Sequence, residues 1–368
     1  MNRNRATNKI LIYVLIGIGV FLVVREDAKA DYVIGTPENL GTAVNSVFAE
    51  VAFCISTDGL ELYFGSDRPG GYGDYDIWVA KRASTDSEWD QAVNLGSQIN
   101  TSSSAGAPCL STDGLELYYG SNRPDGYGNF DIWVTKRVNK EEEWSPPTNL
   151  GPPINTATSE IFPSLSPNGL ELYFSDWLGY RPGGQGAQDL WVSTRVNVSD
   201  PWGVPVNLDP PVNSSSGEGL PALSGDGLSL FFTSGRPGGY GGDEIWITTR
   251  TSNLDLWSEP VHLGPPVNTS WHDGSARLSE DNSALYFYSD RPGSYGDSDL
   301  WKVSIETIVD LNSDGIVDAA DMCIIVDHWG TDNSLCDVGP MPWGDGVVDV
   351  QDLIVLAEHL FEEIPPAE

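Results

Sequence analysis

The sequence is poor in basic residues. It carries 19 Lys and Arg against 53 Asp and Glu, which gives a formal net charge of −34 at pH 7. A surface this acidic repels nucleic acid and anionic membranes, so we exclude both as partners. The same charge attracts cations such as calcium, and it also keeps an exported protein soluble.

Familiar hydrolase signatures are missing. The chain has no Gly-x-Ser-x-Gly elbow and no His-Glu-x-x-His, and its four histidines form no ligand pattern. The segment Gly71-Tyr72-Gly73 and its copies look like phosphate-loop fragments, but they lie between strands and no helix follows them. We interpret them as turns and expect no catalytic residue of these classes.

Long apolar runs are absent except at the N-terminus. There, the basic residues Arg3, Arg5 and Lys9 precede an apolar run from Ile10 to Val24. Ala28-Lys29-Ala30 then offers a small-x-small cleavage site, so residues 1–30 are predicted to be a secretory signal peptide. An uncleaved anchor is the alternative, but a spanning helix needs roughly 20 residues. We expect a mature protein that spans no membrane and lies outside the cell or at its surface.

What the sequence does contain is a repeat. Asp-Gly or a close variant recurs at spacings of 55, 55, 58 and 55 residues, at Asp58-Gly59, Asp113-Gly114, Asn168-Gly169, Asp226-Gly227 and Asp281-Asn282. A fixed period of this size, made of short strands and turns, indicates stacked blades or coils.

Each unit predicts four short strands. In the first unit, Val51–Ser56 and Leu60–Phe64 flank the Asp-Gly turn as a hairpin. A third strand is expected over Asp76–Ala80, after the Pro69-Gly70-Gly71 turn, and a fourth over Ala92–Leu95. Four antiparallel strands per unit are typical of a propeller blade.

The phase of the repeat predicts how the ring closes. Asn-Leu-Gly or a variant begins at Asn39, Asn94, Asn149, Asn207 and His262. The first copy precedes the first hairpin, and none follows Leu300-Trp301-Lys302. The strand near Pro37 should therefore complete the blade opened by the fifth unit, which gives an all-β five-bladed propeller without an open edge.

These units resemble the PD40, or TolB-type WD40-like, propeller repeat. The resemblance rests on Ser-x-Asp-Gly, Leu-Tyr-Phe, Ser-Asp-Arg-Pro-Gly-Gly and Asp-Ile-Trp, and it covers about residues 36–305, within a domain of residues 31–305. It implies a binding platform more than a chemistry, because one fold hosts many functions.

Charged residues recur in every unit. An arginine stands eight residues before a carboxylate, at Arg68 and Asp76, Arg123 and Asp131, Arg181 and Asp189, Arg236 and Glu244, and Arg291 and Asp299. We expect each arginine to hold its carboxylate as structural scaffolding.

A second set of acids lies eight residues before the turns, at Glu50, Glu160, Glu218 and Asp273, with Ala105 in the second unit. Hairpin pairing should place Glu50 opposite Asp67 and beside Arg68. If the first strands line the central channel, these acids could crowd its mouth and hold a ligand or cation. The alternative, which we favour, is a set of structural pairs with the adjacent arginines.

The third unit departs from the others by three extra residues between Phe174 and Arg181. This insertion presents Trp177 and Tyr180, which could stack on a sugar or dock a protein. A glycosidase would need only two or three carboxylates, for which the acid set is the sole candidate. Its repetition argues against catalysis, which needs acids in unlike environments.

Four cysteines remain to be placed. Cys54 and Cys109 occupy the same position in units one and two, and we interpret them as buried small residues. Cys323 and Cys336 lie close together in the C-terminal part of an exported chain, where a disulfide is plausible.

The pattern changes after the last propeller strand. Residues 310–321 match a twelve-residue calcium loop, with Gly315 at the sharp turn and a short helix after it. The predicted ligands are Asp310, Asn312, Asp314, the Ile316 carbonyl, Asp318 and Asp321. A second, incomplete loop would use Asp337, Asp345, the Val347 carbonyl, Asp349 and Asp352.

Two loop–helix calcium repeats at the end of a secreted protein resemble a type I dockerin. The resemblance covers Val309 to about Glu363, within a domain of residues 306–368. It implies a small α-helical, calcium-binding domain that docks to a cohesin-like scaffold or cell-surface protein. In that family, loop positions 10 and 11 read the partner; here they are Ala319-Ala320 and Val350-Gln351, which departs from the common Ser-Thr. A calcium-stabilised domain used for export or anchoring is the alternative.

The sequence thus predicts a secreted, non-catalytic propeller that binds carbohydrate or protein, with calcium as its cofactor. Two other classes stay open. One is a polysaccharide-degrading glycoside hydrolase, and the other is a structural envelope protein.

Overall fold

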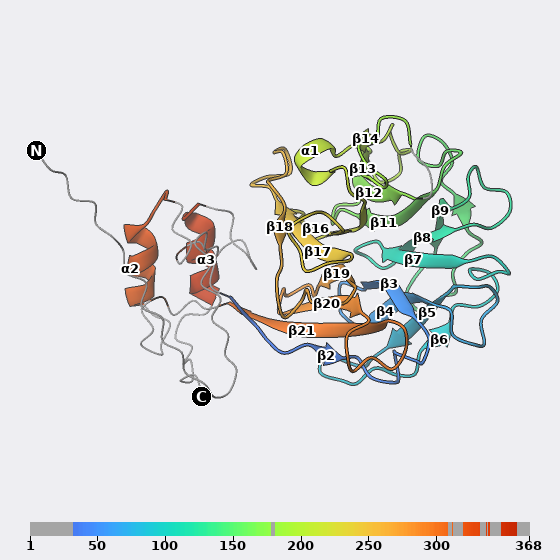
Figure 1. The fold of residues 1–368 in the computed structure, drawn as a ribbon, viewed down its shortest axis with the longest axis horizontal. Coiled ribbons are helices and arrows are strands. Elements are labelled where there is room, and N and C mark those ends of the chain that lie inside the picture. The colour runs from blue at the N-terminus through green and yellow to red at the C-terminus, as the bar shows by residue number, and fades with distance from the viewer. Residues whose placement is uncertain are drawn as a thin grey trace, which may run out of the picture.

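The computed structural model describes residues 32–177, 181–307, 311, 319–331, 336, 338 and 347–358. Its main body is a ring of five antiparallel sheets, so the prediction of a five-bladed β-propeller is confirmed (Figure 1). The predicted signal peptide, Tyr180 and most of the predicted calcium ligands lie outside the described residues. Among those described, no helix is both long and apolar enough to cross a membrane.

Blades one to four each contain four strands in chain order. Blade one consists of β3 (Glu50–Ile55), β4 (Glu61–Ser66), β5 (Asp76–Lys81) and β6 (Val93–Asn94). Blade two consists of β7 (Ala105–Leu110), β8 (Glu116–Ser121), β9 (Asp131–Lys136) and β10 (Thr148–Asn149). Blade three consists of β11 (Glu160–Leu165), β12 (Glu171–Asp176), β13 (Leu190–Thr194) and β14 (Val206–Asn207). Blade four consists of β15 (Glu218–Leu223), β16 (Ser229–Ser234), β17 (Glu244–Thr249) and β18 (Val261–His262), and the one-turn helix α1 (Asp209–Val212) precedes it.

Blade five is closed by the N-terminus, as the repeat phase predicted. Its own strands are β19 (Asp273–Leu278), β20 (Ala284–Ser289) and β21 (Asp299–Thr307). The strand β2 (Glu38–Asn39) pairs antiparallel with β21, with Asn39 opposite Trp301. The strand β1 (Tyr32–Ile34) pairs with the far end of β21, over Ile305–Thr307.

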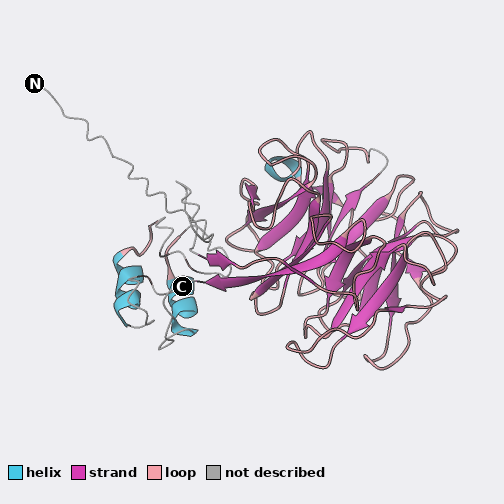
Figure 2. Cartoon of the chain, turned by 60° about the horizontal axis from the view of Figure 1, so that its bottom comes forward, coloured by secondary structure: helices cyan, strands magenta, loops and turns pink. Residues whose placement is uncertain are grey.

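The long β21 carries the chain out of the ring. Figures 1 and 2 show it running from blade five toward the helices α2 (Ala319–Asp327) and α3 (Val350–Glu358), which lie beyond its end. The part of β21 that protrudes from the ring belongs to a two-stranded ribbon, because β1 pairs with it.

Buried apolar side chains fill the spaces between blades. Tyr63 and Ile77 of blade one share a cluster with Leu117 and Trp133 of blade two. Neighbouring sheets cover both faces of each sheet. The second strand of each blade therefore contains a continuous apolar run such as Leu-Tyr-Phe. All six residues of β4 are buried.

The innermost strands β3, β7, β11, β15 and β19 contact one another around the ring. Each has a β-bulge at the same point, where one residue adopts a left-handed backbone, such as Ala52 with φ of 41°. The extra residue shifts the pairing, so Glu50 lies opposite Ser66. The predicted partner, Asp67, was therefore wrong by one residue.

Candidate binding site at the mouth of the central channel

The carboxylate after each glycine-rich loop caps that loop. Asp76 accepts hydrogen bonds from the N–H groups of Tyr72 at 2.5 Å and Gly73 at 3.2 Å, and from the Asn94 side chain at 3.0 Å. Glu244 does the same for its own loop and also contacts His262 at 2.5 Å. The predicted pairing of Arg68 with Asp76 is wrong, because the loop backbone and the asparagine already satisfy this carboxylate.

The arginine pairs instead with the acid at the start of the inner strand. Arg68 Nη2 lies 2.7 Å from Glu50 Oε1, and the guanidinium covers the rings of Phe64 and Trp78 at 5.0 and 5.2 Å. The equivalent pairs are Arg181–Glu160 at 3.4 Å, Arg236–Glu218 at 3.1 Å and Arg291–Asp273 at 2.7 Å.

These four acids are fully buried, with 0% of their surface exposed. Glu50 also accepts hydrogen bonds from the Ser46 N–H at 2.8 Å, the Ser46 hydroxyl at 2.7 Å and the Ser66 hydroxyl at 2.9 Å. Such a carboxylate has little capacity left for a ligand. In the described part of the chain, no three His, Cys, Asp or Glu side chains lie close enough to hold a metal ion. The structure thus brings each acid to an arginine and does not bring the acids together.

Blade two breaks this pattern at two linked positions. Ala105 replaces the acid, and Tyr119 replaces the phenylalanine found in the other blades. The Tyr119 hydroxyl is buried and makes no well-formed hydrogen bond to the described residues, while Arg123 covers the Tyr119 ring at 5.4 Å. Burial raises the pKa of Tyr119, and the nearby Arg123 opposes that shift.

The blades differ most at one end of the channel, on the face where the inner strands begin, which we call the upper face. Five residues there hold equivalent positions, because each carbonyl accepts the N–H of the first residue in the next inner strand. They are Tyr75, Phe130, Gln188, Asp243 and Ser298, with N···O distances of 2.8, 2.9, 2.8, 3.2 and 2.8 Å. We call this ring the channel mouth.

The residue that follows each second strand forms a neighbouring ring on the same face. Asp67 and Asp290 accept backbone N–H groups from Ala49 and His272 at 3.0 and 2.8 Å. At the equivalent position in blade three, Trp177 turns its ring onto Phe130, with centroids 5.7 Å apart and planes at 62°. Trp177 stays 36% exposed, so part of its surface is accessible to a ligand.

The channel mouth therefore has two chemically different sides. Phe130 and Trp177 pack together and make an aromatic side on blades two and three, and Tyr75 holds the position equivalent to Phe130 on blade one. Asp243 and Asp290 make an acidic side on blades four and five, and His272 Nδ1 lies 3.1 Å from Asp290 Oδ2. Burial raises the pKa of Tyr75, and the charges of Asp67 and Asp297 raise it further.

A groove of about 370 Å³ opens on the same face, between blades five and one. Ser46, Arg68 and Gln91 contribute polar groups, while Val47 and Tyr295 contribute exposed apolar surface. Tyr295 is half exposed, like its counterparts in the other blades.

Sequence reasoning found Trp177 through the insertion in its blade but missed Tyr75 and Phe130. Those two precede the repeated Asp-Ile-Trp strand, and their signal was available: this position holds a different residue type in every unit. A position that varies inside an otherwise regular repeat therefore indicates the channel mouth.

The helical segment is described only in part. Asp321 is buried at the start of α2 and accepts the Leu311 N–H at 2.7 Å. At the start of α3, Asp349 accepts the Gln351 N–H at 2.8 Å and Asp352 accepts the Asp349 N–H at 2.5 Å. This is a reciprocal helix cap. These three carboxylates offer oxygen donors suited to calcium, and Ala319, Ala320 and Val350 are exposed at the same helix starts, with Gln351 half-buried.

The cysteines are all free thiols. Cys54 and Cys109 are buried, as expected, whereas the disulfide considered between Cys323 and Cys336 is not formed.

No protein-family model matches the sequence, and the comparison with curated proteins gives no match. Among solved structures, the chain is similar to TolB from Acinetobacter baumannii, with 13% identity, 68% of this chain, 54% of that chain and a TM-score of 0.43. It is also similar to the catalytic domain of the Coprinopsis cinerea GH62 α-L-arabinofuranosidase, with 11% identity, 74% of this chain, 97% of that chain and a TM-score of 0.48. The α-L-arabinofuranosidase from Lactobacillus brevis gives 15% identity, 72% and 91% coverage and a TM-score of 0.47. The chain spans about half the length of the Acinetobacter TolB.

Proposed function

We propose that this chain is a secreted, non-catalytic binding protein whose propeller recognises a carbohydrate at the channel mouth. The observation that supports this most is the aromatic side formed by Phe130 and Trp177, with Tyr75 at the position equivalent to Phe130 in the neighbouring blade. Aromatic rings offer a flat apolar face to the C–H groups of a sugar ring, and a pocket with few polar groups around such faces is typical of small-ligand sites.

The scaffold supports a binding role over a catalytic one. The acid of each pair at the start of an inner strand is buried and already satisfied by hydrogen bonds, so it is poorly suited to protonate or attack a substrate. The groove beside Tyr295 extends the surface available on the same face.

The test is calorimetric titration of the full chain with a panel of oligosaccharides, comparing the wild type with Trp177→Ala. We expect the substitution to weaken binding about tenfold, the equivalent of about 1.4 kcal/mol. Trp329→Ala is the matched control, because Trp329 is an exposed tryptophan that follows α2 and belongs to no blade of the propeller. Equal affinity in the wild type and Trp177→Ala would contradict the proposed site, and binding only to a protein ligand would contradict the ligand class.

We further propose that the helical segment binds calcium and docks to a cohesin-like scaffold or cell-surface protein. The support is the donor chemistry of the predicted loops and the buried position of Asp321 and Asp352 at two helix starts. Calcium would supply the positive charge that draws these carboxylates together. Titration against a cohesin panel should give binding with calcium and none after chelation. Calcium binding without any cohesin partner would leave the anchoring or export role.

A glycoside hydrolase is the second candidate, and one observation favours it. On the acidic side of the mouth, Asp243 is exposed, whereas Asp290 is half-buried and contacts His272. These unlike settings are what acid–base chemistry requires. Release of reducing sugar from a polysaccharide, lost in Asp290→Asn but retained in Glu160→Gln, would establish the enzyme and sink the non-catalytic role. No binding to any glycan or protein would favour a structural envelope protein.

A further inference from the structure

The central channel is narrowed by the five bulges of the inner strands. At the same point in each strand, one residue has a positive φ between 41° and 59°, at Ala52, Ala107, Phe162, Leu220 and Ser275. A single cavity is lined by residues of all five blades at this level, so it lies on the propeller axis. We call this ring of five residues the constriction.

One side chain breaks the symmetry beside the constriction. Arg277 stands where the other blades carry Cys54, Cys109, Ser164 and Ala222. In two of those blades the small side chain accepts an N–H from the next blade, from Leu165 to Cys109 Sγ at 3.4 Å and from Leu223 to Ser164 Oγ at 3.3 Å. Arg277 cannot accept such an N–H, because its guanidinium carries only hydrogen-bond donors. It is also long and positively charged, unlike the small side chains of the other blades.

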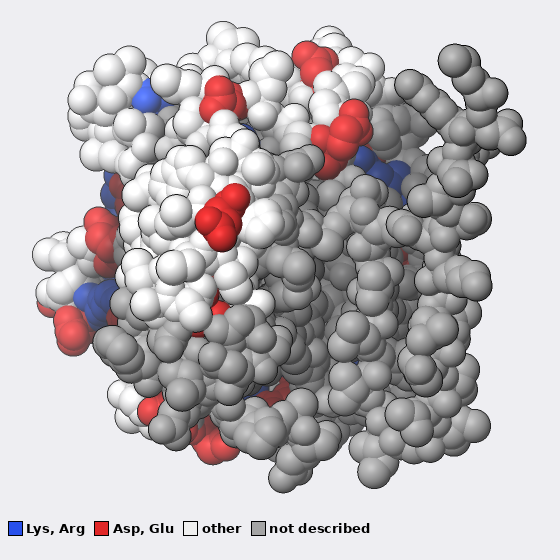
Figure 3. All heavy atoms as spheres, turned by 90° about the vertical axis from the view of Figure 1, so that its left-hand side faces the viewer, with Lys and Arg blue, Asp and Glu red and all other residues white. Residues whose placement is uncertain are grey.

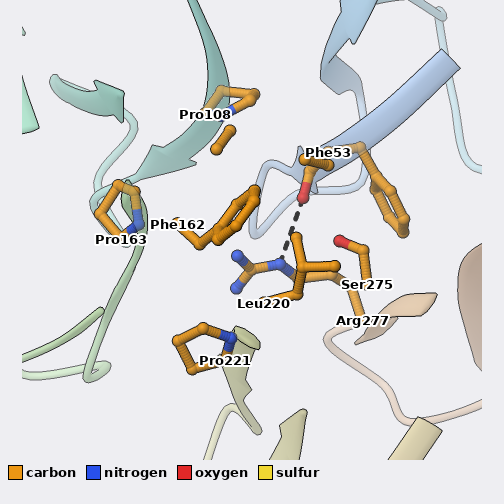
Figure 4. A pocket seen from close by; sticks show the side chains of 10 residues that line it. Phe53, Pro108, Phe162, Pro163, Leu220, Pro221, Ser275 and Arg277 are labelled. Atoms are coloured by element: carbon orange, nitrogen blue, oxygen red, sulfur yellow. Dashed lines mark hydrogen bonds between the residues drawn. The ribbon is translucent and has the colours of Figure 1, made fainter. Parts of the chain in front are cut away.

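Arg277 crosses the axis and joins three blades. Its Nε donates to the Phe53 carbonyl of blade one at 3.3 Å (Figure 4). Its Nη1 donates to Ser164 Oγ of blade three at 3.2 Å. These contacts use two of the five N–H donors of the guanidinium. Within the described residues, Arg277 has no carboxylate partner, unlike Arg68 or Arg291.

Several of the side chains around this cation are apolar. The cavity walls include Phe53, Pro108, Phe162, Leu220 and Pro221 (Figure 4). The centre of a water-sized particle can occupy a volume of about 10 Å³ in this cavity. The cavity therefore has room for one such particle. An unpaired charge in apolar surroundings is costly, so a counter-ion there lowers the free energy of the folded state.

We propose that the axial cavity binds one small monovalent anion of halide size, held by the unused N–H donors of Arg277. The positive charge excludes a cation, and the volume excludes a saccharide or a multi-atom oxyanion. The site is separate from the channel mouth and does not depend on the carbohydrate proposal.

The first test measures thermal unfolding at constant ionic strength while chloride or bromide replaces gluconate, which is too large for the cavity. At a halide concentration about ten times its Kd, the Tm of the wild type should rise by about 3 °C. Arg277→Gln should abolish this rise. Arg82→Gln is the matched control and should keep it, because Arg82 also has no described carboxylate partner but donates to the Gly59 and Thr85 carbonyls at the opposite face.

A second measurement guards against a variant that fails to fold. Crystals of the wild-type protein soaked in bromide should show an anomalous peak in contact with the Arg277 guanidinium. Ser164→Ala, which removes one partner but keeps the charge, should retain the halide-dependent Tm. An equal Tm rise in Arg277→Gln and the wild type, or bromide peaks only elsewhere, would overturn the proposal.

Discussion

At the residue scale, the irregular positions of the repeat carry most of the information. Blade two has two such positions: Ala105 replaces an acid, and Tyr119 replaces a phenylalanine. A buried hydroxyl without a partner costs about 1–3 kcal/mol. The Tyr119 hydroxyl lies beside Arg123. Where the other blades have an ion pair between an acid and an arginine, blade two therefore has a weaker contact between a phenol and a cation.

Tyr119→Phe should therefore stabilise the protein by about 1 kcal/mol, since it removes a buried polar atom and keeps the ring. Tyr118→Phe, one residue earlier in the same strand, should destabilise it by a similar amount, because the Tyr118 hydroxyl donates to Glu116 at 2.8 Å. Urea unfolding of both variants tests the opposite signs. A loss of stability in Tyr119→Phe would show that its hydroxyl has a partner after all.

Blade three offers a pH-dependent position. Asp176 replaces the serine of the other blades, and burial raises its pKa, with a further rise from the charge of Asp189. Between the ordinary pKa and the raised one, the folded state binds more protons than the unfolded state, so stability falls as the pH rises through that range.

Asp176→Asn should remove this loss, because a neutral amide resembles the protonated carboxyl group. Its single oxygen can accept one of the two N–H groups, from Arg181 or Asp189, which bond to different oxygens of Asp176. The variant should be as stable as the wild type at low pH and gain relative stability as the pH rises. Urea titrations across the acid range check this. A constant difference between the two proteins at every pH would contradict the assignment.

Residue identities alone could not give the register of the inner strands. The sequence predicted the hairpins from Asp-Gly and the acid–arginine pairs from their neighbouring positions. It gave no sign of the bulge, because the left-handed residues include Ala52, Phe162 and Leu220, and none of the five is a glycine. Packing between the five blades imposes this left-handed conformation against the local preference of the residues. As a result, Glu50 lies opposite Ser66 and not opposite Asp67.

At the element scale, arginines also join neighbouring blades on the lower rim, opposite the channel mouth. Arg137 at the end of β9 reaches Glu61 of β4 at 2.6 Å, and Arg250 reaches Glu171 at 3.1 Å. Burial alone would raise the pKa of Glu61, but hydrogen bonds from Arg137 and Lys81 lower it overall. Stability from this contact is present at neutral pH and is lost as the pH falls through the lowered pKa.

Glu61→Gln should cost about 3 kcal/mol, because it leaves the buried Arg137 without its counter-charge. Lys81→Ala is the control, since the side chain of Lys81 is 51% exposed and its pair with Glu61 should contribute less than about 1 kcal/mol. Chemical denaturation at neutral pH compares the two. A similar, small cost for both would mean that Arg137 is solvated.

At the scale of the whole molecule, ring and helical segment should unfold separately. The described helices share a small core of their own, with Ile325 and Val348 buried together and no described propeller residue in that cluster. On the side of the molecule that carries them, acidic side chains are scattered over the described surface (Figure 3).

Chelation of calcium should therefore melt α2 and α3 while leaving the propeller intact, if the calcium proposal holds. Calorimetry should show two transitions, and calcium should raise only the one assigned to the helices. Loss of far-ultraviolet helical signal on chelation is the second readout. Identical scans with and without calcium would rule out a structural role for the ion.

The ribbon of β1 and β21 has a mechanical consequence. A partner holding the helical segment would pull on the C-terminal end of β21, while the ring holds the rest of that strand through its neighbours. Because the tension runs along β21, the hydrogen bonds to β1, β2 and β20 would be sheared together, not peeled one at a time. The strand that closes the ring is thus also the one that would resist extension.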